Sequence, residues 1–162
     1  MRVCYNAQRI RIKGNQCLYC GQPAESDDHF PPVVFTGPSG IGFLLPSCNE
    51  CNGLVGSKHP TDLWSRCDVA KASIRKKYRH FLLVPEWSDD EIKEMGPSFR
   101  KGLAAWKKTH DQVKKRIAWS AEWYFSTIVE PRDFADYVAR INTTLESEPE
   151  WCRSLRGCLR ET

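Results

Sequence analysis

The sequence lacks any long apolar run and any strong excess of one charge. No stretch of its 162 residues approaches the roughly 18 consecutive apolar residues that a membrane-spanning helix needs. Charged side chains at Arg2, Arg9 and Arg11 interrupt the region where a secretory signal peptide has its apolar segment. The formal net charge is only +4. These absences argue against membrane and secreted proteins, and we expect a soluble, intracellular chain.

The composition is that of a folded protein with an uneven charge distribution. Hydrophobic residues make up 41% of the chain and charged residues 27%, which excludes a disordered chain and fits one compact domain or a small module with a helical extension. Residues 61–120 carry 14 basic and 8 acidic side chains (+6), against +1 in residues 1–60 and −3 in residues 121–162. A basic middle third suits a polyanionic partner, although a lysine-rich, solvated helix face has the same composition.

Four of the eight cysteines form two Cys-x-x-Cys pairs, Cys17 with Cys20 and Cys48 with Cys51. Each pair makes a tight turn that directs two thiolates to one point, and two such turns complete a tetrahedral zinc site. The alternative of two disulfides or redox pairs fits an intracellular chain less well, because such thiols stay reduced there. A site with four thiolates is coordinatively full, so the pattern predicts structural Zn²⁺.

The segment between the two pairs predicts a hairpin. A β-branched run at 33–35 and an apolar run at 43–45 are typical of short strands, and a Gly/Pro-rich stretch separates them. We expect a helix to begin at Asn52, directly after the last cysteine. Zinc would tie the start of the hairpin to the start of this helix. Asp28 and His29 would then lie close to Asn52.

The order of these residues resembles the zinc-stapled HNH endonucleases of the ββα-metal class, in particular phage recombination endonucleases that cut branched DNA. The resemblance covers about a third of the chain, roughly residues 9–59, and is carried by Cys17, Cys20, Asp28, His29, Pro32, Cys48, Cys51 and Asn52. It implies an α+β fold, with a zinc-bound ββα-metal (HNH) module at residues 1–60 and an α-helical extension at residues 61–162.

The same resemblance implies metal-dependent hydrolysis of DNA phosphodiester bonds. His29 would be the general base, since a histidine with a pKa near 6.5 can accept a proton at neutral pH. Asp28 and the side-chain amide of Asn52 would supply oxygen ligands to a catalytic Mg²⁺ or Mn²⁺. Such an enzyme would be bacterial or phage-encoded and would act on DNA in the host cytoplasm, away from membranes.

Other interpretations of these residues remain open. Asp28 could cap a turn and Asp27 could take the role of the acid, while Asn52 could serve only as a helix N-cap. Phe43 stands where many of the similar nucleases carry an asparagine that braces the catalytic loop. A second hypothesis is therefore a non-catalytic zinc adaptor that binds nucleic acid or a protein, including a phage inhibitor of a host system.

Beyond residue 60 the apolar residues recur with a helical period. The pattern predicts helices at about 62–81, from Ser88 to Gly96 with a capping box, for about 27 residues from Ser98, and from Pro131. Cys67 falls on the first apolar face and is interpreted as a small core residue. An exposed Trp119 would mark a surface for a homodimer formed through the extension.

Basic side chains of the extension are candidate contacts to DNA phosphates. The candidates are Lys58, His59, Arg75, Lys76, Lys77, Arg79, Lys107, Lys108, Lys114 and Lys115. A solvated helix face is the alternative interpretation for each of these clusters.

Overall fold

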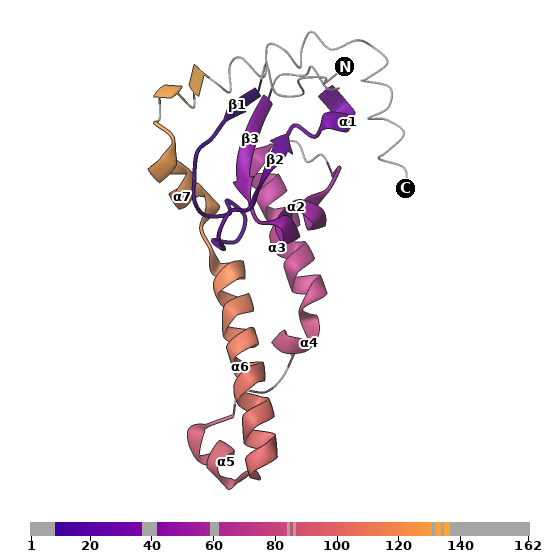
Figure 1. Ribbon diagram of the computed structural model, residues 1–162, viewed down its shortest axis with the longest axis vertical. Helices are drawn as coiled ribbons and strands as arrows, with labels where there is room; N and C mark the ends of the chain where they lie inside the picture. Colours follow the sequence, from indigo (N-terminus) through magenta and orange to yellow (C-terminus); the bar gives the residue numbers. More distant parts are fainter. Residues whose placement is uncertain are drawn as a thin grey trace.

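The computed structural model describes residues 9–36, 42–58, 62–83, 85, 87–130, 132–133 and 135–136. It has the α+β fold predicted, with a small three-stranded sheet and a set of helices. The sheet and α2 (Asn49–Val55) lie toward one end of an elongated molecule, and α5 (Asp89–Glu94) and the start of α6 (Pro97–Ala118) lie at the other end (Figure 1). Among the described residues, no helix is both long and apolar enough to cross a membrane.

The sheet has the order β1-β3-β2. The central strand β3 (Gly42–Ser47) pairs in parallel with β1 (Arg9–Arg11) and antiparallel with β2 (Ser26–Phe30). The strand predicted at 43–45 is confirmed as part of β3. The strand predicted at 33–35 is wrong, because that segment forms the short helix α1 (Val33–Thr36).

The strand that pairs with β3 is the Asp-Asp-His-Phe stretch itself. It ends at Phe30 because two prolines follow, and proline has no N–H with which to extend a ladder. β2 lies at an edge of the sheet, with one side paired to β3 and no other described strand on the other side. Asp28 and His29 therefore sit within a strand.

Two predicted helix boundaries are corrected. α2 begins at Asn49, with Cys48 as its N-cap, so Asn52 lies inside the helix instead of opening it. The helix predicted at 62–81 is interrupted at Tyr78, which separates α3 (Leu63–Lys77) from α4 (Arg79–Leu82). The capping box of α5 is confirmed, since the side chains and backbones of Ser88 and Glu91 bond reciprocally.

The long helix predicted from Ser98 is divided in two. α6 ends at Ala118, and α7 (Ala121–Ile128) begins after Ser120, whose hydroxyl accepts a hydrogen bond from the Trp123 amide. Trp119 between them has an extended backbone. The helix predicted from Pro131 lies almost wholly outside the described residues.

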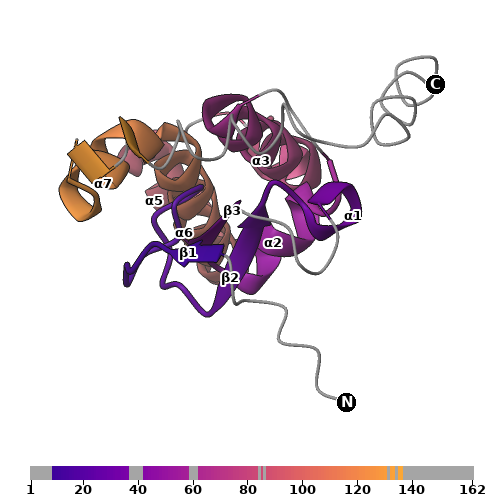
Figure 2. The ribbon, with the colours of Figure 1, turned by 90° about the horizontal axis from the view of Figure 1, so that it is seen from above.

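The hydrophobic core runs without a break across residue 60. Leu45 of β3 and Val55 of α2 belong to the same buried cluster as Ile74, Val113 and Phe125 of the later helices. Cys67 is buried in this cluster as predicted, and burial raises the pKa of its thiol to about 12. Figure 2 shows α2 and α3 together beside the sheet. α6 packs against α3.

Candidate metal centre and active site

The four paired cysteines come together at one end of the sheet. Their sulfur atoms all lie within 4.8 Å of one another, and Cys20 Sγ is 3.8 Å from Cys48 Sγ. A tetrahedral zinc site with Zn–S bonds of about 2.3 Å requires sulfurs about 3.8 Å apart. All four cysteines are buried and none is in a disulfide. The cluster therefore fits a metal ion, as predicted.

The local backbone explains why the thiols converge. The amide of Gly21 donates to the carbonyl of Cys17 at 2.9 Å, and Gly21 has a φ of +70°, a conformation that side chains disfavour. In the second loop the Cys51 amide donates to Cys48 Sγ at 3.4 Å. Hydrogen bonds from the neighbouring thiols lower the pKa of Cys48, while the same sharing raises the pKa of Cys51. Four such close sulfurs cannot all be thiolates unless a cation lies among them.

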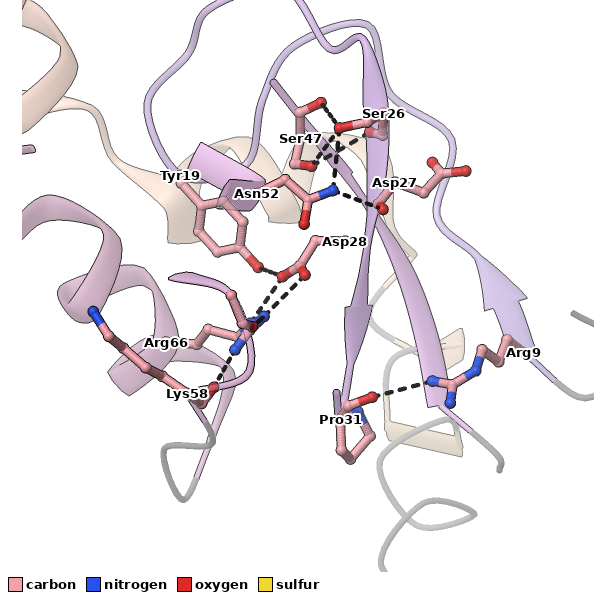
Figure 3. A network of polar contacts seen from close by, with 11 residues as sticks. Arg9, Tyr19, Ser26, Asp27, Asp28, Pro31, Ser47, Asn52, Lys58 and Arg66 are labelled. Atoms are coloured by element: carbon pink, nitrogen blue, oxygen red, sulfur yellow. Dashed lines mark hydrogen bonds and ion pairs between the residues drawn. The ribbon is translucent and has the colours of Figure 1, made fainter. Parts of the chain in front are cut away.

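Asp28 lies on the face of β2 that α2 and α3 cover. Its carboxylate receives Arg66 Nε at 2.8 Å and Arg66 Nη2 at 2.9 Å, and the Tyr19 hydroxyl donates to the same group (Figure 3). Arg66 also donates to the carbonyls of Gly56 and Lys58 at the end of α2. Asp28 is only 3% exposed and Arg66 is fully buried. The acid is thus held in a bidentate ion pair between the sheet and α3.

Asn52 fastens α2 to β2. Its Nδ2 donates to the carbonyl of Asp27 at 3.2 Å and to the hydroxyl of Ser26 at 3.3 Å. The amide oxygen lies on the side of Asp28 (Figure 3). The predicted proximity of Asn52 to the Asp28 and His29 segment is therefore observed, and it depends on a bond to the strand backbone.

His29 lies on the opposite face from Asp28, because successive side chains of a strand alternate. It is half-buried, and burial followed by the charge of Arg9 lowers its pKa below the usual 6.5. The imidazole is consequently neutral at pH 7.

Two arginines of β1 reach across the central strand on either side of His29. Arg9 donates to the carbonyl of Pro31 at 3.1 Å, and it passes Gly42, where a Cβ would lie 3.1 Å from its Nη1. Arg11 pairs with Asp27 at 2.7 Å. Pro31 and Asp27 are the residues two positions after and two positions before His29. The histidine is therefore flanked by two guanidinium groups along one face of the sheet.

The candidate phosphate contacts are spread over several elements. Arg75, Lys76, Arg79, Lys107, Lys108, Lys114 and Lys115 are exposed on α3, α4 and α6. Lys77 pairs with Glu50 at 2.5 Å, and Lys58 reaches the carbonyl of Leu54. His59 lies outside the described residues. Trp119 is half-buried, and its indole N–H donates to the carbonyl of Leu18.

Four residues that the sequence pattern did not single out contact the candidate site: Arg9, Arg11, Tyr19 and Arg66. For one of these four residues, the sequence pattern indicates a buried ion pair. Arg66 lies on the apolar face of its helix, between Leu63 and Ala70, and a charged residue there requires a buried partner. The sequence gives no such indication for the arginines of β1, because the residues that they contact come from distant segments of the chain.

Comparison with protein-family models, with curated proteins and with solved structures finds no match to this chain. What the site can do chemically is therefore inferred from its residues alone. These are a four-thiolate cluster that fits a metal ion, a carboxylate and an amide beside each other, and a neutral histidine between two guanidinium groups. Together they can bind an anion and accept a proton.

Proposed function

We propose that this protein is a zinc-stabilised, metal-dependent endonuclease of the HNH type that hydrolyses DNA phosphodiester bonds. The observation that supports it best is the hydrogen bond of 3.2 Å from Asn52 Nδ2 to the Asp27 carbonyl, beside the four-cysteine cluster. It joins α2 to the strand that carries Asp28 and His29. Three residues of one predicted motif thus meet at one strand.

His29 is the proposed general base. Phosphodiester hydrolysis needs a group that removes a proton from the attacking water, and a neutral imidazole can do so at pH 7. The lowered pKa of His29 keeps it in that form. Beside it, the guanidinium of Arg11 suits the oxygens of a phosphate, which it can bind through charge-assisted hydrogen bonds.

Asp28 and Asn52 are the proposed ligands of the catalytic divalent ion. Asp28 Oδ2 already receives Arg66 Nε and the Tyr19 hydroxyl, whereas Oδ1 receives only Arg66 Nη2. Oδ1 therefore keeps one lone pair for a metal, and the Asn52 oxygen lies on the same side. A bound Mg²⁺ or Mn²⁺ would act as a Lewis acid on the phosphate and stabilise the leaving oxygen.

The edge position of β2 reconciles the two faces. Asp28 and His29 are adjacent residues that point to opposite faces of a strand whose outer edge is unpaired with any other described strand. A DNA backbone that follows this edge would meet His29 directly, and the divalent ion would reach Asp28 beneath α2 and α3. The exposed lysines and arginines of α3 and α6 would add salt-sensitive affinity for the flanking phosphates.

The second candidate is a zinc adaptor that binds nucleic acid or a protein without cutting. The buried Asp28–Arg66 pair favours it, because a carboxylate that is 3% exposed is a poor ligand for a hydrated ion. In that case the motif would be retained for structure alone.

Plasmid nicking with Mg²⁺ or Mn²⁺ separates the two candidates. Wild type should nick, and His29→Ala should lose about 10²- to 10⁴-fold in rate while keeping its metal content and fold. The matched control is His80→Ala, which removes an exposed histidine of α4. DNA binding without nicking by wild type would favour the adaptor, and a panel of duplex, branched and single-stranded DNA would define the substrate.

A further inference from the structure

Arg116 of α6 reaches the four-cysteine cluster from the helical part of the chain. Its Nη1 pairs with Glu50 at 2.7 Å, and its Nη2 lies 3.8 Å from Cys51 Sγ. The side chain is only 9% exposed, and its Nε is buried without a hydrogen-bond partner in the part of the chain that the structure describes. Because a guanidinium has five N–H donors, Glu50 alone cannot satisfy it.

The charges around this arginine do not balance without the cluster. Arg116 and Lys77 both pair with the single carboxylate of Glu50, which leaves one positive charge in excess. Glu50 lies in the second cysteine loop, between Cys48 and Cys51. Four thiolates around one divalent ion carry a net charge of −2, which the excess positive charge would offset in part.

The end of α6 is also anchored to the first cysteine loop. The Trp119 indole N–H donates to the carbonyl of Leu18 at 3.1 Å, between Cys17 and Cys20. The ring lies directly over Gly21, where a Cβ would come within 2.4 Å of it. The last turn of α6 and the residue after it therefore touch both cysteine loops.

We propose that Arg116 is the outer-sphere partner of the four-cysteine metal centre and that its guanidinium makes metal binding and the docking of α6 interdependent. The N–H groups of Arg116 donate to the thiolate sulfurs and compensate the negative charge of the filled site. When the site is empty, the guanidinium loses this partner and the end of α6 loses part of its attachment. The inference requires a metal at the cysteines and does not depend on nuclease activity.

Metal affinity of the full-length protein tests this role. Zinc affinity is measured by competition with a chelator, and Co²⁺ substitution reports the thiolate-to-metal charge-transfer band. Arg116→Met should weaken zinc binding about 10- to 100-fold and shift the cobalt band, as losses of outer-sphere partners do. Arg116→Lys should retain part of the affinity. Arg100→Met, which removes an exposed arginine of the same helix, should change neither readout.

Glu50→Gln distinguishes the electrostatic role from loss of packing. Both Arg116→Met and Glu50→Gln break the same ion pair, yet only the first removes positive charge from the sulfurs. Glu50→Gln should therefore keep or tighten zinc binding. Equal weakening in both variants would overturn the inference, and so would unchanged affinity in Arg116→Met. If Arg116→Met folds poorly, Arg116→Gln, which also removes the positive charge, can replace it.

Hydrogen exchange tests the coupling to α6. In wild type, amides at 110–128 should become more protected when zinc is added, and in Arg116→Met this gain should be much smaller. Equal gains in the two proteins would overturn the coupling. A wild type that binds neither Zn²⁺ nor Co²⁺ would overturn the metal centre as well, whereas loss of nicking alone would affect only the nuclease proposal.

Discussion

The two faces of β2 give neighbouring residues of one motif different degrees of burial. On the face toward α2 and α3, Asp28 is buried, and its carboxylate is bound by Arg66 and Tyr19. On the other face, His29 is half-buried and Asp27 makes a more exposed ion pair with Arg11, whose side chain is 57% exposed. Strand alternation thus gives Asp28 a buried, ion-paired environment and its two neighbours a more exposed one.

The two faces of β2 also differ in the contacts that attach them to the rest of the molecule. The Asp28 face is joined to α2 through Asn52 and to α3 through Arg66, and it adjoins the core that contains the four clustered cysteines. The His29 face is held by two cross-strand arginines, of which Arg9 is buried and Arg11 is exposed. Changes at Asp28 should therefore lower stability as well as activity, whereas changes at His29 and Arg11 should act mainly on substrate binding and rate.

The largest effect is expected from the metal centre itself, because both faces depend on it. Cys48→Ser, or removal of the metal with a chelator, should unfold the sheet and α2, since structural zinc contributes about 10 to 16 kcal/mol in small zinc-binding peptides. Circular dichroism and metal stoichiometry measure the result. His29→Ala should leave both unchanged, and loss of zinc in that variant would contradict the division between the faces.

The next effect compares the two adjacent acids. Asp28→Asn leaves Arg66 buried without its ionic partner and should lower the free energy of unfolding by about 3 to 5 kcal/mol. Asp27→Asn breaks only the more exposed pair with Arg11 and should cost about 1 kcal/mol or less. Urea denaturation of the two variants measures the difference. Equal costs would mean that the buried pair does not stabilise the core.

Sequence reasoning recovered the metal cluster because a Cys-x-x-Cys pair encodes its own geometry within four residues. It also recovered the apolar face of α3 and the capping box of α5, which are local patterns. It placed the first strand at 33–35 because β-branched residues favour strands, although the two prolines before that segment end the strand at Phe30.

The partners of the candidate site could not be predicted, since they come from distant segments. Arg66 is 38 residues from Asp28, and Arg11 lies on a three-residue strand too short to carry a pattern. Alternation along β2, which separates Asp28 from His29, follows only once that stretch is known to be a strand. The spacing of the motif thus predicted proximity but not the side on which each residue lies.

A smaller effect is expected from Arg11 if it binds phosphate on the His29 face. Arg11→Met should reduce kcat/KM for DNA about tenfold, as expected when one charge-assisted hydrogen bond is lost. Its unfolding free energy should change by about 1 kcal/mol or less, because its pair with Asp27 is near the surface. Arg132→Met, which removes an exposed arginine beyond α7, is the control. An equal loss of rate in both variants would indicate nonspecific charge effects.

The smallest effect concerns the pH dependence of the proposed base. Burial and then the charge of Arg9 lower the pKa of His29, so the neutral form persists below the usual value of about 6.5. The acid limb of kcat/KM should accordingly lie below that pH, since activity is lost only when the imidazole becomes protonated. Arg9→Gln removes the second cause and should move the limb upward, whereas Arg9→Lys keeps the charge and should leave it in place. A limb at the same pH in all three proteins would show that the charge of this guanidinium does not act on the titrating group.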